Sequence, residues 1–248
     1  MNALLLLLLD SRAPAGAHHH SGGMEAAVGT GLVTGLPDLE GFCRAKLRTS
    51  ARVSAAFAAA ACRLQSDDPE RAVVRPPGRL RPGEWALLEW AQLEWALLDT
   101  EYEARTPSGA MRAASRQLGG GLLRLLRSLL PDADLVTQWE RCAAPAPHHP
   151  LALGAGIALA GGAPELAARA AALSACAGPA SAAVRLLGLD PFAVQAMLAR
   201  LAPGIDDCAR RAATYARRPP ASLPCDGAPA LDLLADFHLT AEVRLFAS

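Results

Sequence analysis

Alanine and leucine together restrict what this chain can fold into more than any other feature of the sequence. They account for 55 and 41 of the 248 residues, about 39% of the chain. Both residues favour α-helix. Valine and isoleucine, which favour strands, number only 11 together, and aromatic residues make up 4%. The sequence therefore predicts an all-α fold, a single compact multi-helix domain of about ten helices.

The charges are balanced and sparse. Lys and Arg total 24, as do Asp and Glu, while hydrophobic residues make up 52% of the chain. This composition excludes a disordered chain and offers no bulk charge for nucleic acid or anionic lipid. Only one basic residue, Lys46, is a lysine, and Ala45 precedes it. Because a Walker A loop needs Gly-Lys-Ser/Thr to hold phosphates, the chain is not a P-loop nucleotide hydrolase.

The N-terminus contains a run of six leucines, Leu4–Leu9, which faintly resembles a signal peptide. The run has no basic segment before it, is shorter than a usual signal core, and is followed at once by Asp10. No apolar run reaches the roughly 18 residues of a membrane span. We therefore expect a buried first helix in a cytoplasmic protein that makes no contact with a membrane.

The six cysteines do not form a metal-binding pattern. None is in a Cys-x-x-Cys pair, so we expect neither a zinc site nor a disulfide framework, and no bound cofactor. The simplest interpretation is that these cysteines are buried and act as small apolar residues. They are Cys43, Cys62, Cys142, Cys176, Cys208 and Cys225.

Prolines and glycine-rich breaks divide the chain into helices, because proline is tolerated in the first turn of a helix. No shift in composition separates two domains, so we expect one domain over 1–248. Its Pro- and Gly-rich tail, about 219–248, should be less ordered and make few contacts. The predicted helices are 3–10, 22–33, 37–64, 83–104, 108–130, 150–161, 164–177, 180–188, 191–202, 204–217 and a short one near 229–237.

Residues 84–98 repeat a five-residue unit, EWALL-EWAQL-EWALL. Five residues advance a helix by about 140°, so Trp85, Trp90 and Trp95 spread around it and at least one should face away from the core. Two interpretations remain open. The repeat is either a duplication in a permissive helix, or an exposed tryptophan in it anchors a partner.

Opposite charges are segregated onto two neighbouring predicted helices. Residues 83–104 contain acidic residues and no basic one, whereas residues 105–131 contain arginines and no acidic one. The short turn Thr106-Pro-Ser-Gly predicts an antiparallel helical hairpin with Thr106 as the N-cap of its second helix. The charges either pair across the hairpin or form docking surfaces of opposite sign.

Histidine-rich segments are the first candidates for chemistry. Consecutive residues on a helix point about 100° apart, so His18, His19 and His20 do not converge on one metal ion. Ser21 is a candidate N-cap, and Glu25 lies where the helix dipole favours a carboxylate. A capped helix with solvated histidines, or transient contact with a divalent metal, both fit this pattern. The pair His148-His149 is sequential as well, and the residues alone define no catalytic site.

A second pattern places small residues on one helix face. Arg112, Ser115, Arg116 and Gly119 are spaced i, i+3, i+4 and i+7. Because Ser115 and Gly119 are small and four residues apart, another helix can approach closely there. Packing is a sufficient explanation for this face, and a docking surface is the alternative.

Several blocks of the sequence, from residue 10 to the last residue, form a specific set of motifs. The N-terminal block contains Asp10, Ser11, Pro14, Gly16, His20, Ser21, Gly23 and Glu25. The later blocks are Glu103-Ala-Arg105-Thr106-Pro107, Arg112-x-Ala-Ser115-x-Gln117-x-Gly119, His149-Pro150, Val184-Arg-Leu-Leu-Gly-Leu-Asp-Pro191 and the ending Arg244-Leu245-Phe246-Ala-Ser248. Together these blocks resemble the UreF family of urease accessory proteins, whereas the EWALL repeat and His19 depart from the family pattern.

The resemblance implies a function without catalysis. UreF proteins are all-α, tend to form dimers, and bridge the accessory protein UreD (also called UreH) and the GTPase UreG. That complex docks on apo-urease and couples GTP hydrolysis to nickel insertion. The resemblance therefore implies a nickel-insertion chaperone or adaptor that forms a homodimer in isolation. The alternative is a helical enzyme that uses His18–His20 and Glu25 for acid–base chemistry.

The last residues carry the most specific prediction about a partner. Arg244 lies beside Leu245 and Phe246, and an arginine next to large apolar side chains is typical of an interface anchor. The resembling family uses its C-terminal region to bind UreD. We therefore expect this tail to bind the partner, with Arg112, Ser115 and Gly119 as a second candidate surface. The other interpretation is that the tail covers the protein's own core.

Overall fold

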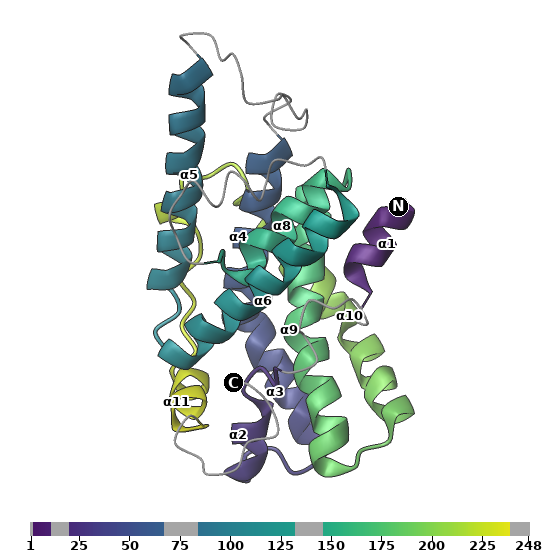
Figure 1. Ribbon diagram of the computed structural model, residues 1–248. Helices are drawn as coiled ribbons and strands as arrows, with labels where there is room; N and C mark the ends of the chain where they lie inside the picture. The colour runs from purple at the N-terminus through teal and green to yellow at the C-terminus, as the bar shows by residue number, and fades with distance from the viewer. Residues whose placement is uncertain (1, 11–19, 67–83, 132–145, 239–248) are drawn as a thin grey trace.

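The computed structural model describes residues 2–10, 20–66, 84–131 and 146–238, and within them it contains helices and no β-strand (Figure 1). The predicted all-α fold is confirmed. The helices are α1 (Ala3–Leu9), α2 (Met24–Gly29), α3 (Leu36–Arg48), α4 (Ser50–Ser66), α5 (Glu84–Ala104), α6 (Gly109–Leu129), α8 (His149–Leu159), α9 (Pro164–Leu187), α10 (Pro191–Ala213) and α11 (Pro229–His238), with a short 3₁₀-helix η2 (Pro220–Ser222).

Helix α4 is the centre of the bundle and packs against α3, α8, α9 and α10. Seven of its residues are alanines, and most of its side chains are buried. Small side chains let neighbouring backbones approach closely. A Cβ added to Gly154 of α8 would lie only 2.1 Å from the carbonyl oxygen of Ala58. The alanine-rich composition therefore serves close helix packing as well as helix formation.

Helix α9 is the one helix of the described residues that is long and apolar enough, by length and composition, to cross a membrane. It lies inside the bundle, in contact with α2, α3, α4, α8 and α10. Ten of its residues are buried, and eight of those are alanine. Packing within the domain therefore accounts for its apolar composition.

The helix starts follow the prolines, as predicted, but three predicted divisions differ from the structure. Pro164 and Pro191 lie in the first turns of α9 and α10. Each of these helices then continues through an internal proline, Pro179 or Pro203, where the sequence predicted a break. The predicted helix 37–64 is instead divided at Thr49, whose backbone angles (φ −128°, ψ −111°) are not helical.

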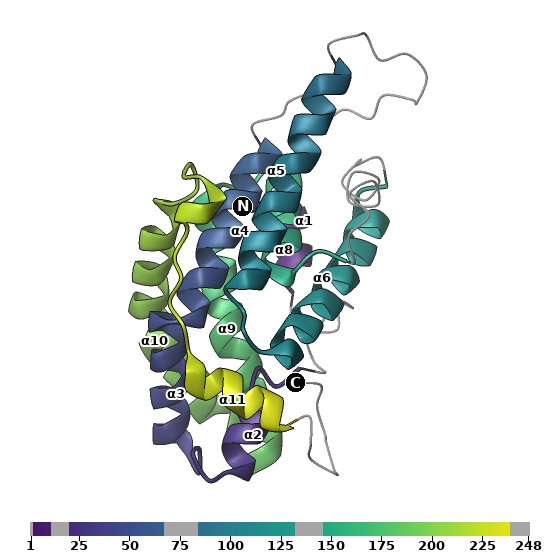
Figure 2. The same cartoon turned by 90° about the vertical axis from the view of Figure 1, so that its left-hand side faces the viewer.

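The α5–α6 hairpin opens from its turn (Figure 2). The two helices run in opposite senses, as predicted, but diverge away from the turn. The cap differs from the prediction: the Ser108 hydroxyl accepts a hydrogen bond from the Met111 amide at 3.2 Å and caps α6. Thr106 is not the cap, because its hydroxyl donates to the carbonyl of Tyr102 at the end of α5.

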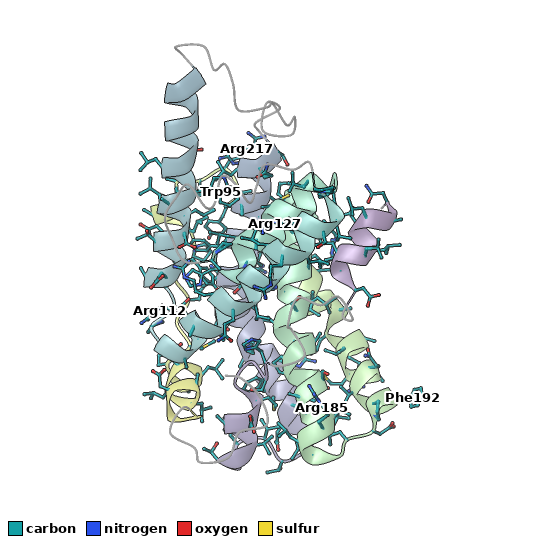
Figure 3. All side chains as sticks on the ribbon, in the orientation of Figure 1. Trp95, Arg112, Arg127, Arg185, Phe192 and Arg217 are labelled. Carbon is teal, nitrogen blue, oxygen red and sulfur yellow. The ribbon has the colours of Figure 1, made fainter. Side chains whose placement is uncertain are left out.

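The cysteine prediction holds in part, whereas the tryptophan prediction is not tested by the described side chains. Trp95 is buried (Figure 3), while the side chains of Trp85 and Trp90 lie outside the described part of the molecule. Four cysteines are buried as predicted, and burial raises the pKa of Cys62 to about 12 and of Cys208 to about 11. Cys225 is exposed, contrary to the prediction, because it lies in the extended segment after η2; Cys142 lies outside the described residues.

Candidate functional site

The internal blocks of the resemblance meet at the turn between α5 and α6. Glu103 lies in the last turn of α5 and Arg105 directly follows the helix, while Arg112 and Ser115 lie in the first two turns of α6. Residues 146–149, which lead into α8, lie against both helices through the hydrogen bonds and close contacts described below. We call this region the α5–α6 junction.

Arg116 is the centre of the junction's charges. Its Nη1 atom donates to the two carboxylate oxygens of Asp99, at 2.8 and 2.6 Å, and to the carbonyl of Ala146 at 3.0 Å. Its Nη2 atom donates to Glu103. Arg112 also approaches Glu103, at 3.7 Å, and donates to the carbonyls of Thr106 and Pro107. The segregated charges therefore pair across the hairpin, the first of the two alternatives.

His148 fills the space between the two helices. Its ring is fully buried, lies 4.8 Å from the Tyr102 ring, and places Nε2 3.3 Å from the Glu103 carboxylate. Its backbone amide donates to Asp99 at 3.3 Å. Burial, together with the nearby charge of Arg116, lowers the pKa of His148 to about 4. The imidazole is therefore neutral at pH 7 and acts as a packed, hydrogen-bonded part of the core.

Ser115 and Gly119 allow the close approach that their spacing predicts, but their neighbour is not a helix face. A Cβ added to Gly119 would lie 1.8 Å from the carbonyl oxygen of Pro147. The Ser115 hydroxyl accepts a hydrogen bond from the His149 amide at 3.2 Å. The backbone entering α8 therefore packs on this face. These two residues serve contacts within the chain, whereas Arg112 keeps about a third of its side chain exposed (Figure 3).

Asp99, Glu103 and His148 also have the residue types of a metal site, and their ligand atoms lie within 4.8 Å of one another. Arg116 donates to both carboxylates, and Arg112 lies 3.7 Å from Glu103, so two guanidinium groups balance the two carboxylates. The donor set therefore fits an arginine-centred ion-pair cluster better than a resident metal. Sequence reasoning missed Asp99 and His148 as members of this cluster, because both lie outside the recognised blocks.

The N-terminal block joins the site through Gly22 and Gly23, which have positive φ angles of 59° and 88°. Gly23 is the N-cap of α2, so Ser21 is not the cap that the sequence predicted. The left-handed turn places Ser21 before the helix, where its side chain is buried. Glu25 lies in the first turn of α2 and Asp10 caps the end of α1. The other block residues, Ser11, Pro14 and Gly16, lie outside the described residues, as do His18 and His19.

A cavity of about 240 Å³ lies where these segments meet. It is lined by His20 of the N-terminal block, by Ser115 of α6 and by His149 at the start of α8. Burial, followed by the nearby His20, lowers the pKa of His149 to about 4. Further residues of α3, α4, α5, α9 and α11 complete the wall. The family-like blocks thus enclose a common space that their order in the sequence does not reveal.

The segment 219–238 is more firmly held than the sequence predicted. Arg105 donates from Nη2 to the carbonyls of Ala221 and Leu223, at 3.0 and 3.3 Å, and from Nε to that of Pro224 at 3.1 Å. Ser108 donates to Asp236 of α11 at 2.6 Å. The expected shortage of contacts is therefore wrong for this part of the tail, because two residues of the junction hold it. Arg244, Leu245 and Phe246 lie outside the described residues.

Fold and site define an all-helical protein organised around an arginine-centred junction, and the comparisons place it in a family. The UreF family model matches residues 33–202. The urease accessory protein UreF of Mycobacterium marinum is 39% identical over 246 residues, covering 99% of this chain and 98% of that protein. The urease accessory protein UreF of Mycolicibacterium vanbaalenii is 41% identical over 248 residues, with the same coverage. The chain belongs to the UreF family of urease accessory proteins.

Proposed function

We propose that this protein is a non-enzymatic adaptor in nickel insertion, which bridges UreD/UreH and the GTPase UreG and brings them to apo-urease in the cytoplasm. The observation that carries the proposal is the similarity to urease accessory proteins over 99% of the chain. An adaptor of this kind needs stable surfaces rather than reactive groups. In keeping with that, the charges of the α5–α6 junction pair with one another.

The C-terminal tail is the proposed contact with UreD. Helix α11 is tied to the junction through Asp236 and ends at His238, ten residues before the C-terminus. Arg244, Leu245 and Phe246 therefore follow a firmly held helix.

The test is a pull-down with co-expressed UreD and UreG, together with a thermal melt of each variant. Arg244→Ala, or deletion of 244–248, should leave the melting temperature nearly unchanged and weaken binding about thirtyfold, because an arginine anchor contributes about 2 kcal/mol or more. Arg48→Ala, an exposed arginine on α3, is the matched control and should bind normally. A tail variant that folds and binds at wild-type strength would contradict the proposal.

Two further measurements address the rest of the proposal. The purified protein alone should turn over neither urea nor GTP, whereas any turnover would favour the helical-enzyme alternative that uses His18–His20 and Glu25. Light scattering should find a homodimer of the isolated protein. A monomer at high micromolar concentration would contradict the proposed dimer. The adaptor function would still be tested by the pull-down.

A further inference from the structure

The cavity contains a buried lysine without a counterion. Lys46, the only lysine in the sequence, lies in the last turn of α3, lines the cavity and is 5% exposed. Its Nζ atom donates to the carbonyl of Gly22 at 3.1 Å and lies 5.7 Å from the centre of the Phe42 ring. No carboxylate of the described residues forms an ion pair with it. Its neighbours are therefore a neutral carbonyl, a ring face and the nearby thiols of Cys43 and Cys176, none of them a carboxylate.

The other charged groups on the cavity wall are engaged elsewhere. Asp226 pairs with Arg52 at 3.2 Å, and Arg105 is occupied by Glu101 and by backbone carbonyls. Burial raises the pKa of Asp232, which favours its neutral form. Burying an ammonium group without a counterion costs several kcal/mol. Burial accordingly lowers the pKa of Lys46. An anion that entered the cavity would supply the missing charge.

A hydroxyl without a hydrogen-bond partner lines the same cavity as Lys46. The Ser50 hydroxyl is shielded from solvent and has no hydrogen-bond partner among the described residues. Ser50 begins α4 four residues after Lys46, beyond the break at Thr49. A buried hydroxyl without a partner costs about 1–3 kcal/mol. The Lys46 ammonium and the Ser50 hydroxyl, which lie on neighbouring turns, suit the two oxygens of a carboxylate.

The other wall residues and the volume of the cavity indicate what the uncharged part of a ligand would be. Val53, Met111, Leu118 and Leu231 line the cavity, so most of a bound molecule would contact apolar side chains. A single available ammonium balances one negative charge, which disfavours a phosphate dianion. A 150 Å³ protein cavity holds benzene, so in proportion about 240 Å³ accommodates roughly ten non-hydrogen atoms.

We propose that this cavity binds a small monocarboxylate with an apolar chain or ring, whose carboxylate pairs with Lys46 and Ser50. The ligand class follows from one buried cation, one unpartnered hydroxyl, apolar walls and the cavity volume. Binding of this kind is a property of the isolated chain. It can therefore be tested, and can fail, independently of the proposed interactions with UreD and UreG.

The experiment titrates the full-length protein with hexanoate, whose eight non-hydrogen atoms fit the cavity. A protein labelled with ¹³C-lysine gives a single Cε signal, because Lys46 is the only lysine. Hexanoate should shift that signal in a saturable way and release heat in calorimetry. Hexan-1-ol, which has the same apolar chain and no charge, should bind at least about tenfold more weakly. An unmoved Lys46 signal at saturating hexanoate would overturn the proposal.

Three variants separate the charge from the cavity. Lys46→Met should weaken hexanoate binding about tenfold or more without lowering the melting temperature, while Arg48→Met, an exposed cation on the same helix, should bind normally. Gly178→Leu should block binding by filling the cavity, because Gly178 lines it and an added Cβ meets no atom within 4 Å. Wild-type affinity in Lys46→Met would refute the site.

Ser50→Ala keeps the proposal testable if Lys46→Met does not fold. This variant removes a hydroxyl that has no partner, so the melting temperature should not fall. Hexanoate binding should weaken by about threefold to tenfold. Unchanged affinity in a folded Ser50→Ala variant would remove Ser50 from the site, and a still-saturable Lys46 signal would then support the lysine alone.

Discussion

Adding one carbon to Gly119 should destabilise the whole junction. In the Gly119→Ala variant the new Cβ would begin 1.8 Å from the carbonyl oxygen of Pro147, whereas ordinary contact begins at 3.4 Å. The Pro147 carbonyl belongs to the backbone, so no side chain can rotate away. Helix α6 and the segment 146–149 would have to separate by about 1.6 Å, the difference between those two distances.

That separation would strain the hydrogen bonds that join the two segments. The Arg116–Ala146 bond is 3.0 Å long and the His149–Ser115 bond 3.2 Å. Overpacking typically costs about 1–3 kcal/mol, and each weakened hydrogen bond about 1 kcal/mol. The better helix propensity of alanine returns about 1 kcal/mol. We therefore expect a net loss of about 2–4 kcal/mol, a fall in melting temperature of roughly 5–15 °C for a chain of this size. Gly119→Leu should cost more, and Ser115→Leu should act in the same direction.

The assay is thermal unfolding of Gly119→Ala beside a matched control, Gly41→Ala. Gly41 is an exposed residue within α3, and an added Cβ there meets no atom within 4 Å. The control should gain about 0.5–1 kcal/mol, because alanine loses less backbone entropy on folding than glycine. The two glycine-to-alanine changes thus have opposite expected signs. A Gly119→Ala protein that melts at or above the wild-type temperature would refute the close approach.

Other expectations follow from the same region. Arg116→Met should cost about 3–5 kcal/mol in chemical denaturation, because it leaves Asp99 buried without its partner, and adding Asp99→Asn should restore part of that loss. Lowering the pH from about 6.5 towards 4 should destabilise the protein: the unfolded chain gains a proton on His148 near pH 6.5, whereas the folded one does so only near pH 4. His148 and His149, whose pKa values are both lowered to about 4, should each contribute a slope of about 1.4 kcal/mol per pH unit, and His148→Gln should remove only its own share. Arg105→Gln should speed limited proteolysis between 219 and 228 without unfolding the bundle, because it releases four backbone carbonyls.

Sequence signals that act within a few residues predicted where the helices begin, but they did not predict which helices continue and which are broken. A proline in the first turn has no amide hydrogen bond to lose, so Pro164 and Pro191 mark the starts of α9 and α10. The same residue type inside a helix sacrifices a hydrogen bond and bends the chain. At Pro179, which is buried in the bundle, packing offsets that loss, and α9 continues. The break at Thr49 has no glycine or proline signal at all.

The site shows the same division between local and long-range information. The spacing of Ser115 and Gly119 correctly indicated a close contact, because small residues four apart always share a helix face. It could not identify the backbone of residues 146–149 as the neighbour. Asp99 and Arg116 are 17 residues apart, and nothing in the pattern of charges selects this pair from the other acids and arginines of the hairpin.

The amino-acid sequence by itself determined the helical class, most helix starts and the family, because propensity, capping and motif identity act within a few residues of the chain. Only the tertiary structure decided which polar groups are buried and with what partners. No signal in the sequence marks Lys46 or His148 as buried. Their burial arises where helices distant in sequence meet, and it is burial that removes water and changes the energy of their charges.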